Sequence, residues 1–244
     1  MELFLKIVTV FVIGGTIGWV MEFFYRRYAH GKWVNPGFLT GPCLPLYGSG
    51  LLLLYGLCHI DYSFIVSYPL RIIVQIVLQT VILTGIEYIT GFVFVNFYHV
   101  RLWDYSKRVG NIQGIICPLF TVIWGAIGAI YSFVLHSHIK TFVSYVVGTP
   151  AMSFLLGIYS GILVVDLCYS FHIVTKIKKW SSEQNFIVRY ENLKLEIRNR
   201  AEARKDKKPF LFFFRTKQGF LDELENYIAT LREKQTDRKR RNEK

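Results

Sequence analysis

The sequence has few of the features that mark a soluble enzyme. It contains only four cysteines, Cys43, Cys58, Cys117 and Cys168, and no two of them have the spacing of metal ligands. We therefore expect free, buried thiols, no bound metal and no cofactor. The sequence also has no glycine-lysine phosphate loop, no H-E-x-x-H zinc motif and no G-x-S-x-G nucleophile motif. With no recognisable catalytic motif, whether the chain is an enzyme stays open.

Charge is scarce in most of the chain. Residues 1–175 hold nine Lys/Arg and six Asp/Glu, whereas residues 176–244 hold twenty and eleven. A basic chain often binds nucleic acid. Here the basic residues lie in a tail and in short loops, as on the cytoplasmic side of membrane proteins, so we expect membrane lipid and no nucleic acid as partner. The start, Met1-Glu2-Leu3, lacks a positive leader, so we expect the first apolar segment to be retained.

Long apolar runs predict an all-α, polytopic membrane helix bundle over residues 1–175. A helix needs about 20 apolar residues to cross a bilayer. Segments that qualify lie at about residues 3–24, 45–60, 69–95, 115–135 and 142–174, which gives about five spans. The second is short, and the fifth contains Gly148-Thr149-Pro150, so whether it is interrupted near Pro150 stays open.

The connecting loops differ in charge. The first and third loops hold most of the basic residues outside the tail: Arg26, Arg27 and Lys32, and Arg101, Lys107 and Arg108. Short loops rich in Lys and Arg stay on the cytoplasmic side, and with five spans both loops share that side with the tail. We therefore expect a multi-pass protein of the cell membrane with its N-terminus outside. The fourth loop, with His136 and His138, is then external.

The tail, residues 176–244, has two apolar stripes at helical spacing. One consists of Phe186, Tyr190, Leu193, Ile197 and Ala201, and the other of Phe220, Leu224, Tyr227 and Leu231. Between them, the aromatic and basic segment 207–215 is typical of a membrane-surface anchor. We predict a basic, amphipathic, cytoplasmic helical tail. Docking on the membrane and a coiled-coil contact, which would form a homo-oligomer, both stay open.

We interpret the first 135 residues as two copies of one hairpin unit. In each copy an acidic residue lies late in a span, and an asparagine precedes a G-x-x-x-P-L-aromatic entry into the next span. These residues are Glu22, Asn35 and Gly41–Tyr47 in the hairpin over about 3–60, and Glu87, Asn111 and Gly114–Phe120 in the hairpin over about 69–135. Two such units would be related by an axis along the membrane normal.

Small residues also recur four apart on three spans. The pairs are Gly14 and Gly18, Gly125 and Ala129, and Gly157 and Gly161. Such pairs let helix backbones approach closely in lipid, so we interpret them as ordinary helix packing.

Several strings in this region resemble a family of bacterial membrane proteins labelled putative ABC-transporter type IV, or CmpB-like. They are Gly18-Trp19-Val20-Met21-Glu22, Asn35 to Gly48, Glu87-Tyr88, Leu102 to Ser106, Asn111 to Gly114, and Trp124-Gly125. The resemblance covers roughly the first 135 residues and leaves out the basic tail. It implies a multi-pass membrane protein and supplies no reaction or substrate.

Glu87 is the residue that most strongly indicates a site. It lies about eight residues, or roughly 12 Å, inside its span. A carboxylate at such depth costs roughly 2.5–3.5 kcal/mol, so we expect it to face the protein interior with a partner or a proton. Arg26, Arg27 and Arg101 are the candidate partners. A functional carboxylate and a structural ion pair both stay open. Glu22 is nearer the interface, with Arg26 one turn later.

The cytoplasmic loops combine arginine, aromatic and asparagine residues. Arginine suits phosphate groups, whereas Trp and Tyr settle at head-group depth, so interfacial anchoring is the competing interpretation. We predict a cleft for an anionic or lipid-like ligand at the cytoplasmic leaflet. Its residues are Glu22, Arg26, Asn35, Gly41, Glu87, Arg101, Trp103, Asp104, Tyr105, Asn111 and Gly114.

Three functions follow from this pattern. We favour a membrane transport component with this cleft; because the chain has no ATPase motif, an ATP-driven system would need a separate ATPase subunit. A lipid-modifying enzyme is an alternative, with Asp104 and Glu87 as acid and base. A membrane-anchored scaffold or regulator that acts through its basic tail is another.

Overall fold

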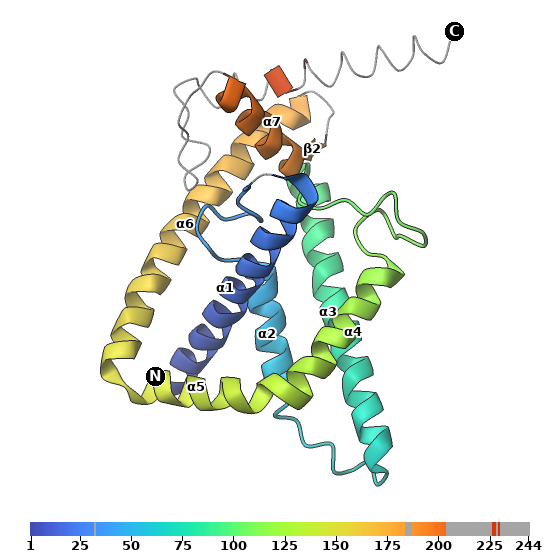
Figure 1. The fold of residues 1–244 in the computed structure, drawn as a ribbon, viewed down its shortest axis with the longest axis vertical. Coiled ribbons are helices and arrows are strands. Elements are labelled where there is room, and N and C mark those ends of the chain that lie inside the picture. Colours follow the sequence, from blue (N-terminus) through green and yellow to red (C-terminus); the bar gives the residue numbers. More distant parts are fainter. Residues whose placement is uncertain (32, 184–186, 204–225, 228, 230–244) are drawn as a thin grey trace.

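The structure, a computed structural model, describes residues 1–31, 33–183, 187–203, 226–227 and 229. It is helical, with two short strands (Figure 1). The helices are α1 (Glu2–His30), α2 (Pro45–Leu57), α3 (Tyr68–Tyr98), α4 (Pro118–Ile130), α5 (His136–Gly148), α6 (Pro150–Glu183) and α7 (Tyr190–Ala203). A π-helical turn, η1 (Tyr131–Leu135), joins α4 to α5, and β1 (Val100–Arg101) pairs in parallel with β2 (Val188–Arg189). The predicted all-α class is confirmed.

Four helical segments are long and apolar enough to cross a membrane. They are Glu2–Ala29, Tyr68–Tyr98, Pro118–Gly148 and Pro150–Lys179. The second predicted span is α2, whose 13 residues extend about 20 Å, less than the roughly 30 Å of the hydrocarbon core. α2 begins at Pro45 because proline lacks the N–H that the first turn leaves unpaired. The bundle therefore has four long helices and one shorter one.

The segment between the last two spans differs from the prediction. His136 and His138 lie in helix α5, so the expected loop around them is wrong. The chain runs from α4 through η1 into α5 without a loop, and α5 then connects to α6 along one edge of the bundle (Figure 1). The interruption that was left open lies at Thr149, whose backbone is extended, and α6 begins at Pro150.

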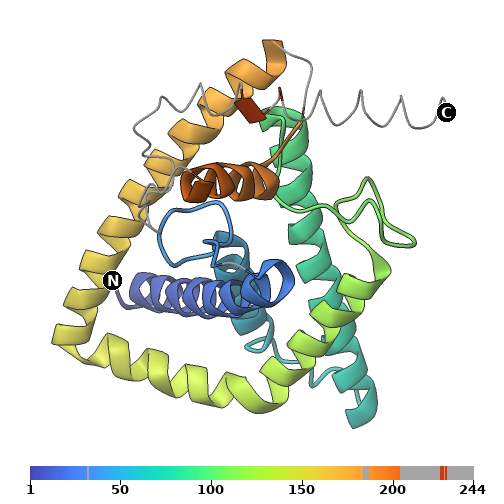
Figure 2. The same ribbon diagram turned by 45° about the horizontal axis from the view of Figure 1, so that its top comes forward.

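Helices α3 to α6 form a frame around α1 and α2 (Figure 2). The glycines of α1 allow α2 to lie close, because a Cβ added at Gly14 would lie 2.6 Å from the Cβ of Leu51. A Cβ at Gly125 would lie 2.8 Å from Oγ1 of Thr80 on α3. The helix-packing interpretation is confirmed at these positions. It is wrong for Gly157 and Gly161, where an added Cβ meets nothing within 4 Å among the described residues.

The main buried core lies at one end of the bundle. It joins Phe38 and Leu39 of the first loop, Phe94 of α3, Val174 of α6 and the apolar face of α7. That face consists of Tyr190, Leu193 and Ile197, which are all buried. The first predicted tail stripe therefore packs against its own chain in this part. Tyr227 of the second stripe is also buried, whereas Phe186, Phe220, Leu224, Leu231 and the segment 207–215 lie outside the described residues.

The first loop, the third loop and the tail meet at this end. β1 opens the third loop and pairs with β2 of the tail, and Val188 N donates to His99 O at 2.9 Å. α7 lies over the first loop (Figure 2). Which side of the membrane this end faces stays a prediction. The four cysteines are free thiols; Cys43 and Cys117 are buried as expected, but Cys168 is exposed.

Candidate functional site

Glu87 on α3 is buried and accepts hydrogen bonds from two neutral donors. Trp124 Nε1 on α4 donates to its Oε2 at 2.9 Å, and the Tyr105 hydroxyl donates to its Oε1 at 3.1 Å. Among the described residues no Lys or Arg pairs with this carboxylate. None of the three candidate arginines is therefore its partner, and two aromatic side chains donate to it instead.

Glu22 on α1 is the second carboxylate of this wall. The Tyr47 hydroxyl of α2 donates to its Oε1 at 3.0 Å, and its Oε2 lies 3.6 Å from Arg26 Nε, one turn later. Arg26 also pairs with Glu191 of α7 through its terminal nitrogen. Glu22 keeps 27% of its side chain exposed, whereas Glu87 is 2% exposed. Of the two carboxylates, Glu22 is therefore the one that a ligand can reach.

The two carboxylates are linked by an aromatic contact between the hairpins. The rings of Tyr47 and Trp124 lie 5.7 Å apart between centroids and are inclined by 58°. Each ring donates to one carboxylate from its polar edge, so residues of four helices, α1 to α4, bring Glu22 and Glu87 to one wall. We call Glu22, Arg26, Tyr47, Glu87 and Trp124 the carboxylate cluster. Sequence reasoning did not select Tyr47 or Trp124, although both belong to the strings that carry the family resemblance.

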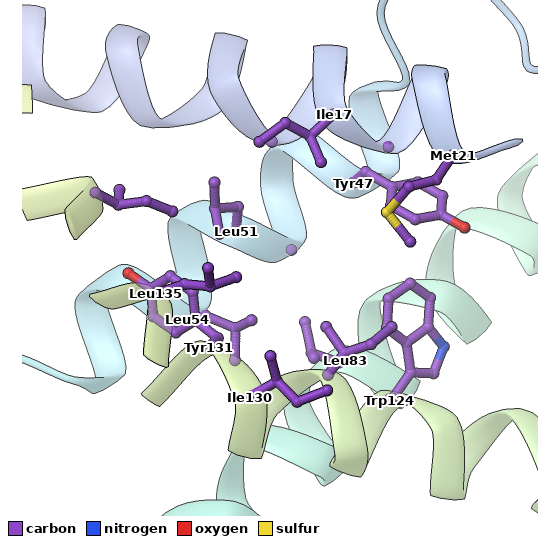
Figure 3. Close-up of a pocket in the computed structure, with 15 residues that line it drawn as sticks. Ile17, Met21, Tyr47, Leu51, Leu54, Leu83, Trp124, Ile130, Tyr131 and Leu135 are labelled. Atoms are coloured by element: carbon purple, nitrogen blue, oxygen red, sulfur yellow. The ribbon is translucent and has the colours of Figure 1, made fainter. Parts of the chain in front are cut away.

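An apolar cavity of about 270 Å³ lies next to this cluster (Figure 3). Tyr47, Met21 and Trp124 stand at one end, and Tyr131 and Leu135 at the other. The lining comes from α1, α2, α3, α4, η1 and α5 and is apolar apart from the edges of these aromatic rings. The polar edge of Trp124 is taken up by Glu87, and the Tyr131 hydroxyl lies 3.0 Å from Nδ1 of His136.

The predicted residues of the third loop mostly hold the loop itself together. Arg101 reaches Asp104 Oδ1 and Gln113 O, both at 3.2 Å, and Trp103 Nε1 donates to Ile115 O at 2.8 Å. Tyr105 is the residue that connects this loop to the carboxylate cluster. Burial and the charge of Glu87 raise the pKa of its hydroxyl, so Tyr105 stays a neutral donor.

The turn at Asn111 closes the same loop. Asn111 Oδ1 accepts from Gly114 N at 2.9 Å, and its amide donates to Arg108 O at 2.8 Å. Gly114 has φ of 68°, which glycine adopts without the strain that a Cβ would bring. Asp104 pairs with Arg189 of β2 at 2.9 Å. Burial acts against ionisation of Asp104, but Ser106 and the two arginines outweigh it and lower the pKa.

Asn35 organises the first loop in the same way. Its Oδ1 accepts from Trp19 Nε1 at 2.7 Å, and its amide donates to Thr40 O at 2.7 Å. Gly41 N donates to Oδ2 of Asp166 on α6 at 2.7 Å, so this loop is tied to α6 as well. The structure thus brings Glu22, Glu87 and Tyr105 of the predicted site to one wall. It leaves Asn35, Gly41, Asn111 and Gly114 within the loops.

The tail adds a residue that the sequence did not indicate. Lys194 of α7 is buried, and its Nζ donates to Gly37 O at 2.7 Å and to Asn35 O at 3.3 Å. Burial, and then the nearby charge of Arg26, lower its pKa to about 7. Its partners lie more than 150 positions away in the sequence, so no local pattern could have found it.

The comparisons with known proteins identify a family. A family model described as Putative ABC-transporter type IV matches residues 9–171, which is more than half of the chain. The match covers α1 to most of α6, and therefore the whole carboxylate cluster and the cavity. Neither the curated proteins nor the solved structures contain a match.

Proposed function

The chain belongs to the family described as Putative ABC-transporter type IV, and from this premise we propose that the carboxylate cluster is the ligand site of a transport system. The family match and the four long apolar helices fit a membrane transport component. The further proposal is that the wall formed by Glu22 and Glu87, with its adjoining cavity, receives a lipid-like ligand.

One observation carries the proposal. Glu87 is 2% exposed within a membrane-spanning helix, and it is held by Trp124 and Tyr105 without a cation among the described residues. An ionisable group at such depth is costly, and in membrane proteins such groups commonly mark ligand or proton pathways. A purely structural role would be served as well by an apolar side chain.

The surroundings favour the lipid-like ligand over a free anion. The cavity beside Tyr47 and Trp124 is apolar, as the acyl chain of a lipid requires. Glu22 and Glu87 both lie in this wall, and among the described residues Arg26 is the one cation that pairs with either of them, so a free anion would be repelled. The enzyme alternative is less favoured, because Asp104 is engaged by Arg101 and Arg189.

The scaffold alternative is less favoured for a similar reason. It would need the apolar face of α7 for a partner, and in the described part of the tail Leu193 and Ile197 are covered by the chain itself. We propose a separate ATPase subunit as the partner instead, because the sequence lacks a phosphate-binding loop.

Purification from the native membrane tests this function. The tagged full chain, extracted in mild detergent, should carry a stoichiometric protein with a nucleotide-binding motif. ATP hydrolysis by the complex should fall in the Glu87→Gln variant without loss of the partner. Isolation of the chain alone after chemical cross-linking in the intact membrane would contradict the proposal.

A further inference from the structure

We propose that the cavity holds an acyl chain of a zwitterionic phospholipid whose head group contacts Glu22 and Arg26. The inference rests on the proposed function because it names the ligand of the same site. The head group carries both an ammonium and a phosphate, as phosphoethanolamine does.

The lining of the cavity favours an acyl chain as the occupant. Of the side chains that line the cavity, those of Tyr47, Trp124 and Tyr131 are the ones with a polar nitrogen or oxygen atom, and the first two donate to Glu22 and Glu87. A water molecule in the cavity would therefore lack the two to four polar partners that it needs, and apolar cavities bind apolar ligands instead. A space of about 270 Å³ would leave the lining without contacts if it stayed empty. A hydrocarbon chain supplies those contacts.

The cavity is open on the side that faces the membrane. Ile17 and Met21 of α1 and Ile130 of α4 line it and are 51%, 54% and 54% exposed. These residues lie within candidate membrane spans, so acyl chains are what surrounds them. A lipid can enter sideways between α1 and α4 without leaving the bilayer.

One face of α1 changes from apolar to charged along its length. Gly14, Gly18 and Met21 line the cavity, and Glu22 and Arg26 follow at the next helical positions on that face. At about 1.5 Å per residue, the step from Gly14 to Arg26 is about 18 Å. An amphipathic molecule that lies along α1 thus meets apolar side chains first and charged ones at its head.

The charged end offers one group for each half of a zwitterion. Glu22 has an exposed fraction of 27%, so an ammonium can reach it. Arg26 Nε is buried and has no hydrogen-bond partner among the described residues, and it lies 3.6 Å from the nearest carboxylate oxygen of Glu22. The Arg26 side chain as a whole is 13% exposed, so a phosphate oxygen can approach the guanidinium and supply the acceptor that Nε lacks. An anionic head group would leave Glu22 facing a second negative charge.

Native mass spectrometry of the purified full chain tests the inference. The probes are phosphatidylethanolamine, phosphatidylglycerol with the same chains, and phosphoethanolamine without chains. We expect one retained phosphatidylethanolamine, at least about tenfold weaker binding of phosphatidylglycerol, and no binding of the free head group. Equal retention of the two lipids, or binding of phosphoethanolamine alone, would overturn the inference.

Variants at the opening make the test specific. Ile17→Trp and Ile130→Trp fill the entrance at exposed positions and should each reduce retention at least about tenfold. Val20→Trp, on the same helix and 41% exposed but outside the lining, should retain the lipid. If both entrance variants bind as Val20→Trp does, the cavity is not the site. A complex that carries an ATPase but no lipid would refute this inference alone, whereas lipid binding with no ATPase would refute the proposed partner alone.

Discussion

Docking of α7 should depend on pH through Lys194. Its pKa falls from 10.5 to about 7 in the docked state, because burial penalises the charged form. In an undocked tail the pKa of the lysine would return to its ordinary value. The difference corresponds to about 5 kcal/mol of free energy against docking the charged form.

The direction of this pH dependence follows from the number of protons that the docked and undocked states bind. Between pH 7 and about 10 the undocked state binds more protons, so docking becomes more favourable as pH rises, by about tenfold in its equilibrium constant per pH unit. Below pH 7 the penalty is complete and the dependence levels off. The pKa of buried Tyr190 is raised above its usual value, so above about pH 10 its ionisation in the undocked tail opposes docking. Among the charged groups that act on the same lysine, Arg26 lowers its pKa, whereas Glu191 and Asp166 raise it.

Spin-label distance measurements can follow the docked fraction. Labels on cysteines at Asn192 of α7 and Lys140 of α5, both exposed, report the two ends of the molecule once the native cysteines are replaced. The narrow, docked distance should gain population from pH 7 to 9. The Lys194→Met variant should show no such change, although it loses the bonds to Asn35 O and Gly37 O. A docked fraction that is constant in the native chain, or falls with rising pH, would refute the reasoning.

Three further outcomes concern stability, measured by thermal unfolding in detergent. Gly18→Ala should lower stability by about 1–3 kcal/mol because a Cβ there would overlap Tyr47. Gly161→Ala, where an added Cβ meets none of the described residues within 4 Å, should be within about 0.5 kcal/mol of the native chain or above it. Equal losses would contradict the α1–α2 contact. Asp166→Asn should cost about 1.5–3 kcal/mol, since it loses charge-assisted bonds to Thr40 and Gly41; an unchanged midpoint would show that this tie is not formed. Tyr47→Phe should cost about 0.5–1.5 kcal/mol by removing one bond to Glu22, and no loss would argue against that bond.

The sequence was sufficient for the features that depend on local pattern. Long apolar runs predicted the long helices, and the heptad-like spacing of Tyr190, Leu193 and Ile197 predicted the apolar face of α7, which is buried. Glu22 and Glu87 stood out because a carboxylate within an apolar run is costly. The first half of α5 was missed because histidine, lysine and serine interrupt its apolar pattern, although the backbone simply continues through η1.

The partners of these residues could not be predicted in the same way. Trp124 and Tyr47 meet Glu87 and Glu22 from other helices, and Lys194 reaches Asn35 across 159 positions. Such contacts depend on how the helices are placed, and a single sequence carries no signal for that placement. An arginine seemed the natural partner of Glu87 on charge alone, but indole and phenol donors satisfy the carboxylate without bringing a second charge into the bundle.

Cross-linking of the two hairpins tests the central claim most directly. Cysteines at Tyr47 and Trp124, whose rings lie 5.7 Å apart, should be joined by a short bifunctional thiol reagent in native membranes. Cysteines at Tyr47 and Val122, which is 71% exposed on α4, should stay unlinked. We expect efficient linkage of the first pair alone. No linkage of the first pair, or equal linkage of both, would mean that Glu22 and Glu87 do not share a wall.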